Sequence, residues 1–342
     1  MSKGLLSSAR GWLRRRRRGD ADPSETWKSL MQSRRVRLKP QLLIDTDAHP
    51  RIFCLGSCFA LEIKKALKTM DFRVSPWDYD LELELPNGGT FISNGEHMVL
   101  YTTFTMRQEF EKAFGLWQQS ADDYWEAKTT DRGGSMFRDP YRRSVVHPSL
   151  EGVIKITNVL DELLREGIRG SDVYILTLGL TEAWQKLDDG RYANQYIPGF
   201  DESISFCQSG YEQNYANLKA IADLVFARFP DRKIVLTVSP VPLKRTFSQE
   251  DVSVANTESK AILRAVAGSV AREYANVYYF PSFEMCALAE KFGTETVFRE
   301  DGRHVRPEMV QTIVQSFLQH HVAPGSINTS GAGTAPTGPL VR

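Results

Sequence analysis

Two side chains that can act as nucleophiles, Ser57 and Cys58, stand where an apolar run meets a predicted helix. The run 53–55 stops at Gly56, and apolar residues then recur every three or four positions over 60–70. A thiol or hydroxyl in the first helical turn faces unpaired backbone N–H groups and the positive end of the helix dipole. This position favours a thiolate or a developing oxyanion, and hence nucleophilic attack. The structural alternative is a capped, buried turn.

A carboxylate and an imidazole stand three residues apart near the other end of the chain, at Asp301 and His304. They lie in a polar loop before the amphipathic segment 307–320. A nearby carboxylate can fix the tautomer of a general-base histidine and stabilise the imidazolium that forms. Of the six histidines, only His304 has an acid three residues before it in a loop that precedes a predicted helix. The alternative roles are a helix-side turn for Asp301 and a solvated loop position for His304.

Together these residues resemble the GSCFA proteins, which are placed among the SGNH/GDSL-type hydrolases. Residues 56–60 spell the family name, and four further segments match, at 176–184, 237–243, 259–264 and 279–284. The resemblance implies a three-layer α/β sandwich with a central, mostly parallel sheet. It also implies an acyl-ester hydrolase or O-acyltransferase that acts on a carbohydrate or a cell-envelope polysaccharide intermediate, without a cofactor.

The superfamily's first and last sequence blocks can be carried over residue by residue. The first block usually reads Gly-Asp-Ser, which places Cys58 in the nucleophile position and Ser57 in the aspartate position. We therefore expect Cys58 to be the nucleophile, with Ser57 as the second candidate. The last block, Asp-x-x-His, falls without gaps on Asp301 and His304.

The third block, Gly-x-Asn-Asp, falls on residues 179–182, so Thr181 replaces the asparagine of the oxyanion hole. The second-block glycine stays open between the Gly88-Gly89 pair and Gly95. Arg303 beside His304 is suited to hold a carboxylate or phosphate. The expected oxyanion and substrate-binding residues are Gly179, Thr181, Glu182, Trp184, Ser239 and Arg303.

The predicted chemistry is an acyl-enzyme on Cys58, with its thiol pKa lowered from about 8.5 by the helix terminus and an imidazolium. Water as acceptor would give an esterase, and a sugar hydroxyl a transferase. A different class of function is a catalytically degenerate glycan-binding or assembly protein on the same scaffold. A third hypothesis is a redox-sensing cysteine.

The elements that must position these residues alternate between strands and helices, as a parallel sheet with crossover helices requires. Strands are predicted at 51–55, 173–178, 233–239 and 277–280. Helices are predicted at 149–166, 211–228, 258–274 and 307–320, besides the one at 60–70. The aromatic-rich region 75–143 does not fit the alternation and predicts an insertion. We expect its part 101–115 to be helical and its part 125–143 to be loop-like, with its aromatic residues in the core or on a substrate-binding lid.

Length and composition predict one large domain at 41–322, since the chain has 342 residues, 42% of them hydrophobic; two small domains are the alternative. A basic, flexible arm is expected at 1–40, and a disordered tail rich in Gly, Ser, Thr and Pro at 323–342. The run Arg14–Arg18 predicts either a solvated arm or weak contact with an anionic membrane surface. Without a signal peptide or a long apolar span, we expect a cytoplasmic protein, peripheral at the inner membrane surface if the arm binds lipid.

Several classes of site have no support in the sequence. The four cysteines are scattered apart from the pair at 54 and 58, and this spacing predicts neither a disulfide framework nor a metal site. Nucleotide-binding glycine motifs are absent, so no cofactor is expected. The expected partners are an acyl-ester or acyl-donor small molecule and a glycan acceptor, and no nucleic acid.

Overall fold

The computed structural model describes residues 26–38, 44, 49–79, 81–86, 89–128 and 135–321. Within the expected N-terminal arm it places a short helix, α2 (Trp27–Ser33), which has no buried residue. The predictions for Arg14–Arg18 and for the tail at 323–342 lie outside the described residues. In the described part of the chain, no helix is long and apolar enough to cross a membrane.

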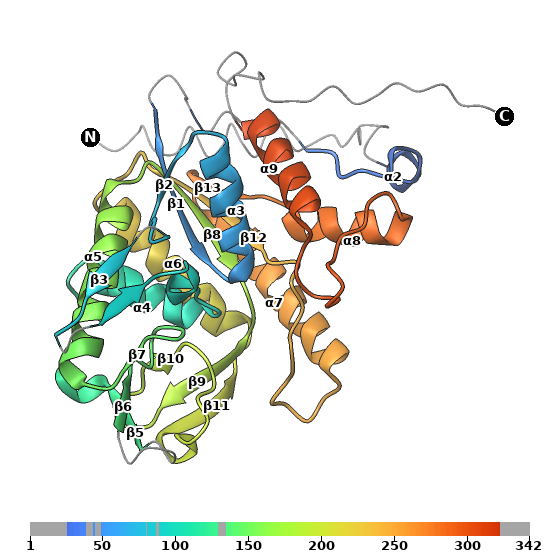
Figure 1. The fold of residues 1–342 in the computed structure, drawn as a ribbon. Helices are drawn as coiled ribbons and strands as arrows, with labels where there is room; N and C mark the ends of the chain where they lie inside the picture. Colours follow the sequence, from blue (N-terminus) through green and yellow to red (C-terminus); the bar gives the residue numbers. More distant parts are fainter. Residues whose placement is uncertain are drawn as a thin grey trace, which may run out of the picture.

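A five-stranded parallel sheet forms the centre of the fold (Figure 1), in the order β13-β12-β8-β1-β2. The four predicted strands are all present, and their ends differ from the prediction by at most one residue. An additional short strand, β2, forms the edge beside β1. The bounds are β1 (Arg51–Gly56), β2 (Arg73–Ser75), β8 (Val173–Leu178), β12 (Lys233–Val238) and β13 (Val277–Tyr279).

The sheet is covered on both faces because alternate residues of each strand point to opposite sides. In β1, Phe53 and Leu55 belong to one buried apolar cluster, and Ile52 and Cys54 belong to the other. This two-sided burial explains why the strands appear in the sequence as continuous apolar runs. The expected three-layer sandwich is confirmed.

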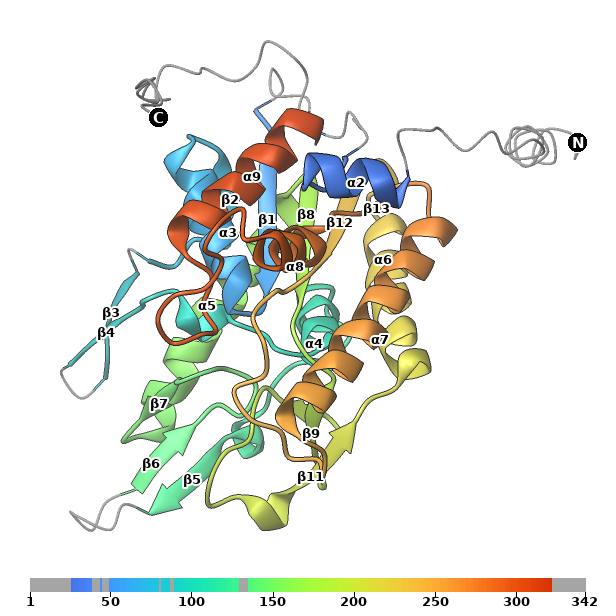
Figure 2. The ribbon, with the colours of Figure 1, turned by 90° about the vertical axis from the view of Figure 1, so that its right-hand side faces the viewer.

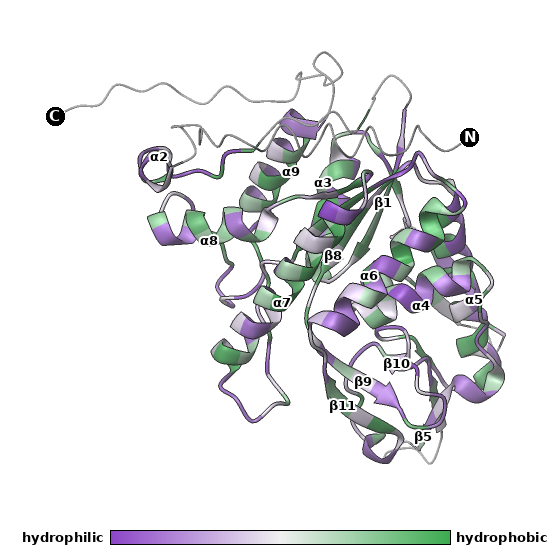
Figure 3. Cartoon of the chain, turned by 180° about the vertical axis from the view of Figure 1, so that it is seen from behind, coloured by the Kyte–Doolittle hydropathy of each residue, from purple (hydrophilic) through white to green (hydrophobic). Residues whose placement is uncertain are grey.

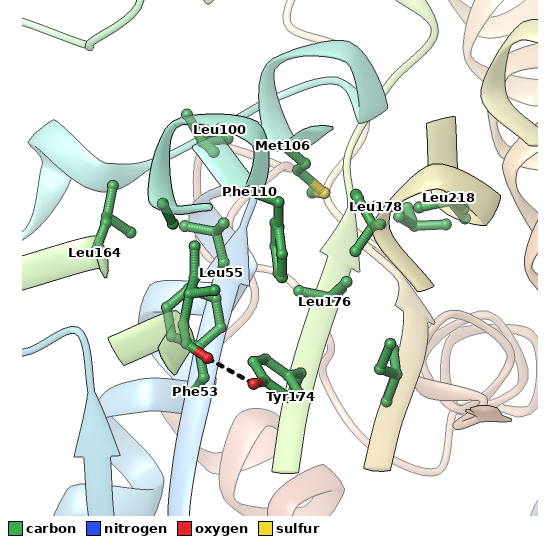
Figure 4. Close-up of a cluster of buried hydrophobic side chains, with 14 of the residues drawn as sticks. Phe53, Leu55, Leu100, Met106, Phe110, Leu164, Tyr174, Leu176, Leu178 and Leu218 are labelled. Carbon is green, nitrogen blue, oxygen red and sulfur yellow. Dashed lines mark hydrogen bonds between the residues drawn. The ribbon is translucent and has the colours of Figure 1, made fainter. Parts of the chain in front are cut away.

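Four helices cover the Phe53 face, and Figure 4 shows part of the core beneath them. Phe110 of α4 packs on the face of the sheet over β1 and β8, with its ring centroid 6.0 Å from that of Phe53 and 6.1 Å from that of Tyr174. The Tyr174 hydroxyl in this core donates a hydrogen bond to the Ile168 carbonyl at 2.6 Å. The helices are α4 (Thr103–Ala113), α5 (Leu150–Gly170), α6 (Tyr211–Phe226) and α7 (Val252–Glu273).

Three helices cover the Ile52 face and lie in front of the sheet in Figure 2. Figure 3 shows that these and the other helices alternate between hydrophobic and hydrophilic residues, whereas the strands of the main sheet are mostly hydrophobic. The three are α3 (Cys58–Thr69), α8 (Ser282–Phe292) and α9 (Pro307–His321).

Of the smaller sheets, β5-β6-β7 and β10-β9-β11 lie beyond the end toward which β8 runs, whereas β3 lies beside α5 (Figure 1). One forms directly after β8, in the order β10-β9-β11. The pairs β3-β4 and β5-β6 fall within the predicted insertion at 75–143, and β7 lies just after it. Their bounds are β3 (Glu82–Glu84), β4 (Thr90–Ile92), β5 (Trp125–Lys128), β6 (Ser135–Arg138), β7 (Val146–His147), β9 (Glu182–Lys186), β10 (Tyr192–Ala193) and β11 (Ile204–Gln208).

The expected loop at 125–143 is wrong, because β5 and β6 pair there as antiparallel strands and β6 also pairs with β7. The expected helix at 101–115 is confirmed as α4. Its Phe110 and Phe114 are core residues, and Phe104 stacks on Tyr192 at 3.9 Å between ring centroids. These three aromatic residues therefore serve packing.

Candidate functional site

The predicted nucleophiles lie at the point where the strand order reverses. From β1 the chain passes to β2 on one side and later to β8 on the other, so a crevice is expected outside the carboxyl ends of β1 and β8. Gly56 ends β1 with φ +140°, and a Cβ there would stand 2.2 Å from the Thr177 carbonyl oxygen. Only glycine allows β1 to pass this close to β8 before the chain turns into α3.

Ser57 and Cys58 differ in exposure at this turn. Ser57 precedes the helix as its N-cap, is 3% exposed, and its hydroxyl has no hydrogen-bond partner among the described residues. Its backbone N–H donates to the Thr177 carbonyl at 3.1 Å. Cys58 is the first residue of α3 and is only partly buried. The thiol is therefore the more accessible of the two groups.

Burial raises the pKa of the Cys58 thiol above its ordinary value. The expected lowering is wrong because loss of solvent outweighs the helix terminus. Three cationic side chains, Arg303, Lys260 and Arg143, oppose this effect, as does the backbone N–H of Cys58 itself. The cations come from three separate segments, so the fold gathers positive charge around this thiol.

The turn after β8 contacts the nucleophile turn and is held by α7. A Cβ on Gly179 would stand 3.2 Å from the Ser57 Cβ and 2.6 Å from the Tyr101 carbonyl oxygen. The Gly179 carbonyl accepts a hydrogen bond from Lys260 Nζ at 2.7 Å, and the Thr181 N–H donates to Ser259 Oγ at 3.0 Å. Thr181 is 2% exposed. Two consecutive residues of α7 thus fix both sides of the turn.

A segment of the predicted insertion, which includes Leu100 and Tyr101, runs beside the end of β1. The Leu100 N–H donates to the Gly56 carbonyl at 2.8 Å, and the Tyr101 carbonyl accepts from the Leu180 N–H at 3.0 Å. Arg143 donates to the Tyr101 hydroxyl at 3.0 Å. The insertion therefore contacts both turns of the candidate site, the one after β1 and the one after β8.

The glycines considered for the second block lie elsewhere or outside the described residues. Gly89 lies beside the turn between β3 and β4, and Gly95 faces the Tyr79 ring. Gly88 is outside the described residues.

Asp301 and His304 form the predicted pair. His304 Nδ1 and an Asp301 carboxylate oxygen are hydrogen-bonded, and the same carboxylate accepts the backbone N–H groups of Arg303 and His304. These bonds hold the pKa of the Asp301 carboxyl well below its usual range. Both side chains are accessible, with His304 44% and Asp301 46% exposed. In the described part of the chain no hydrogen bond joins His304 to Cys58, but the charge of the adjacent Arg303 acts on Cys58.

Arg303 also ties the histidine loop to the loop after β12. One guanidinium nitrogen donates to the Pro242 carbonyl at 3.2 Å, whereas its buried Nε has no partner among the described residues. Ser239 begins the loop after β12, and its fully buried hydroxyl accepts from the Val241 N–H at 3.3 Å. Ser239 thus shapes the loop that Arg303 contacts.

Glu182 and Trp184 project from β9. The Glu182 carboxylate accepts the backbone N–H of Phe247 at 3.0 Å, which fixes the far end of the loop after β12. The Trp184 ring lies among Tyr196, Phe206 and Phe247, at 4.7 to 5.3 Å between centroids. Glu182 therefore holds the loop after β12, and Trp184 belongs to an aromatic cluster on the β10-β9-β11 sheet.

A cavity of about 670 Å³ lies between α4 and α5, where Glu109, Lys112, Trp117 and Asp161 are among its lining residues. None of the predicted site residues lines it, so it is separate from the Cys58 site. No group of three or more His, Cys, Asp or Glu side chains in the described ranges could hold a metal ion.

Sequence reasoning missed Lys260 and Tyr101, and it named Arg143 only as part of a loop. Lys260 had one available signal, since it lies on the stripe that carries Leu263 and Ala267 on the buried side of α7. A lysine on an apolar stripe is unusual unless it has a buried partner.

The fold and the site define an α/β/α protein with a thiol at the switch point of a parallel sheet and a separate Asp–His pair beside it. The chain belongs to the GSCFA family, since the model of this family matches residues 51–317. A comparison with curated proteins finds no match.

Three esterases are among the solved structures to which the chain has low similarity. A carbohydrate esterase family 3 protein from Talaromyces cellulolyticus has 11% identity and a TM-score of 0.33, over 78% of this chain and 94% of that one. An inhibitor-bound aryl esterase from M. smegmatis has 13% identity and a TM-score of 0.30, over 79% and 97%. The acetyl xylan esterase Est2A from Butyrivibrio proteoclasticus has 12% identity and a TM-score of 0.28, over 79% and 63%.

Proposed function

We propose that this protein is an acyl-ester hydrolase or O-acyltransferase that forms an acyl-enzyme on Cys58. The observation that carries the proposal is a partly accessible thiol at the start of α3, with three cationic side chains acting on it. Cations near the reacting carbonyl stabilise both a thiolate and the oxyanion of a tetrahedral intermediate. Ser57 is the weaker candidate because its side chain is buried, with its Cβ next to Gly179.

The proposed reaction has two steps. In the first, Cys58 Sγ bonds to the acyl carbon, the thiol proton passes to His304, and the ester C–O bond breaks as the leaving alcohol takes that proton. In the second, the hydroxyl oxygen of water or of an acceptor bonds to the acyl carbon and the C–S bond breaks, which releases the carboxylic acid or the new ester. The hydroxyl proton passes through His304 to the sulfur and restores the thiol. Asp301 keeps the imidazole in one tautomer. His304 acts through one water or after a small shift of its loop.

A carbohydrate hydroxyl is the acceptor we propose for the transferase reaction. The loop after β12 contacts Arg303 through Pro242 and carries Phe247 further along, next to Trp184. Phe247 is 37% exposed. Exposed aromatic rings are suited to stack on sugar rings, so Phe247 is the residue that we propose to contact the sugar.

The test is acylation by p-nitrophenyl acetate and by acetyl-CoA, with the labelled peptide located by mass spectrometry. We expect label on Cys58 in the wild type, none there in Cys58→Ala, and strongly slowed labelling in His304→Ala. Ser57→Ala is the control for the adjacent residue and should label normally. Label lost only in Ser57→Ala would move the nucleophile to Ser57, and no label with either donor would contradict the proposal.

The second candidate function is a glycan-binding or assembly protein without turnover. Two observations favour it: burial raises the pKa of the Cys58 thiol, and Thr181 stands where the superfamily has an oxyanion-hole asparagine. An unreactive thiol together with glycan binding that survives in His304→Ala would support this function against the first.

A further inference from the structure

The cavity between α4 and α5 takes no part in the proposed reaction, since none of the proposed site residues lines it. Its volume of about 670 Å³ lies in the range of pockets that hold small molecules, about 300–1,000 Å³. Most such pockets are lined by apolar side chains, whereas charged and amide side chains make up most of this lining. A ligand here would therefore be held mainly by hydrogen bonds.

Two carboxylates and two cations form a network at the wall of the cavity. Lys112 Nζ lies 2.7 Å from Asp161 Oδ1 and 3.3 Å from Glu109 Oε1, so it joins α4 to α5. Arg142 is fully buried and pairs with the same two carboxylates. Buried ion pairs often add no more stability than apolar side chains of similar volume, so folding alone does not explain this polar wall. The network holds its members in fixed positions and leaves no excess charge among them.

The remaining charged residues of the lining are exposed on α5. Arg165 pairs with Glu162, and the Arg169 side chain has no hydrogen bond or ion pair with the described residues. The lining as a whole is thus close to neutral. Because complementary charge selects an ionic ligand, this balance favours an uncharged one.

Three amide side chains, those of Gln118, Gln119 and Asn158, complete the polar lining. Gln118 and Asn158 are exposed, and their side chains bond to no other residue in the described part of the chain. Gln119 donates to Asp139 at 3.2 Å, while its carbonyl oxygen has no partner in the described ranges. An amide both donates and accepts, as each hydroxyl of a sugar does. Neighbouring sugar hydroxyls can therefore bond to both ends of one amide.

The Trp117 ring supplies an apolar surface in this polar lining. Its Nε1 donates to the Gln108 carbonyl at 3.1 Å, and the Arg191 guanidinium lies over the ring at 4.4 Å from its centroid. These contacts fix the ring before any ligand binds, which lowers the cost of binding. The C–H groups of a sugar pack against an aromatic ring, whereas its hydroxyls turn to polar groups. The cavity offers both kinds of surface.

We propose that this cavity is a carbohydrate-binding site, which holds a neutral sugar unit of a glycan away from Cys58. The balanced charge selects an uncharged ligand, the amides and the fixed carboxylates bond to its hydroxyls, and Trp117 packs against its C–H groups. This inference goes beyond the proposed reaction and does not depend on Cys58 as the nucleophile.

Saturation-transfer NMR tests the proposal with cellobiose, lactose and N,N′-diacetylchitobiose as neutral probes and digalacturonic acid as the acidic probe. Binding would be titrated in wild type and in the double variant Gln118→Ala/Asn158→Ala. Both amides are exposed and make no bond to another described residue, so their loss should leave the melting temperature unchanged. The matched control is Gln311→Ala/Gln315→Ala, which removes two exposed amides from α9.

We expect at least one neutral probe to bind the wild type, with a Kd that rises at least about tenfold in Gln118→Ala/Asn158→Ala and does not change in the control. Digalacturonic acid should bind more weakly than this probe. The proposal is overturned if no neutral probe binds, if the Kd is unchanged in Gln118→Ala/Asn158→Ala, or if digalacturonic acid binds most tightly.

Further results separate this site from the proposed acyl site. Loss of binding in Phe247→Ala, with wild-type binding in Gln118→Ala/Asn158→Ala, would place the sugar on the surface of Phe247 and overturn the cavity site. Acylation of Cys58 without sugar binding in the cavity would keep the proposed function and refute this inference. Sugar binding in the cavity without acylation by any donor would keep the cavity site and refute the acyl-enzyme.

Discussion

Replacing Lys260 by glutamine should change how the stability of the protein depends on pH. The pKa of Lys260 falls from an ordinary 10.5 to about 7 in the folded chain, with burial as the largest cause. Between these values the unfolded chain binds more protons at this position than the folded chain does. The free energy of unfolding therefore rises with pH across this window, and Lys260 destabilises the fold most at and below about pH 7.

The magnitude follows from the same two values. A drop from 10.5 to about 7 corresponds to about 5 kcal/mol, which is an upper limit because water penetration and local rearrangement reduce such effects. We expect wild type to gain at least about 2 kcal/mol relative to Lys260→Gln between pH 7 and pH 10.

Urea unfolding of both proteins at several pH values across this range measures the difference, and contributions from other groups cancel in it. Cys58→Ser as a second background removes the thiol, whose raised pKa costs stability at the alkaline end. Lys155→Met, measured in parallel, reports on loss of an exposed lysine. A difference in unfolding free energy between wild type and Lys260→Gln that stays constant with pH would refute the claim that burial lowers the pKa of Lys260.

Three further predictions concern the strand end, the histidine and the aromatic cluster. Gly56→Ala should destabilise the fold by about 3–5 kcal/mol in urea unfolding, since its Cβ meets the Thr177 carbonyl oxygen at 2.2 Å; a loss under about 1 kcal/mol would contradict this packing. Asp301→Asn should slow Cys58 acylation by roughly 10²–10⁴-fold with little change in melting temperature, and an unchanged rate would exclude Asp301 as the group that orients His304. Trp184→Ala should destabilise by roughly 2–4 kcal/mol while iodoacetamide modifies Cys58 as in wild type; altered alkylation would show that the cluster reaches the thiol.

The strands of the main sheet could be predicted from the sequence because both of their faces are buried. Residues 173–178 are all buried in β8, so they form an apolar run that propensity and length identify as a strand. The pairing of β5 with β6 was missed because these strands are partly exposed and mix polar with apolar residues. The edge strand β2 has three residues and was too short to give a pattern.

The positions of the candidate site residues could be predicted from the sequence, whereas their electrostatic environment could not. The turn at 56–58 and the pair at 301 and 304 are local in sequence, so spacing alone could predict them. The electrostatic environment of these residues depends on contacts between distant segments. Lys260 and the Gly179 carbonyl it bonds are 81 residues apart, and nothing within either segment specifies their distance. The predicted lowering of the pKa of the Cys58 thiol was wrong for the same reason, since burial is a property of the assembled fold.

A raised thiol pKa does not by itself argue against a nucleophile. A thiolate that forms less readily is also intrinsically more nucleophilic, so reactivity depends on whether charge is stabilised when the substrate is present. The cations around Cys58 are held by other contacts: Lys260 by Gly179, Arg303 by Pro242 and Arg143 by Tyr101. Groups fixed in this way stabilise developing negative charge without reorganising at the moment of reaction. The arrangement therefore favours a nucleophile whose ionisation is coupled to acyl transfer over a thiolate that persists in the resting protein.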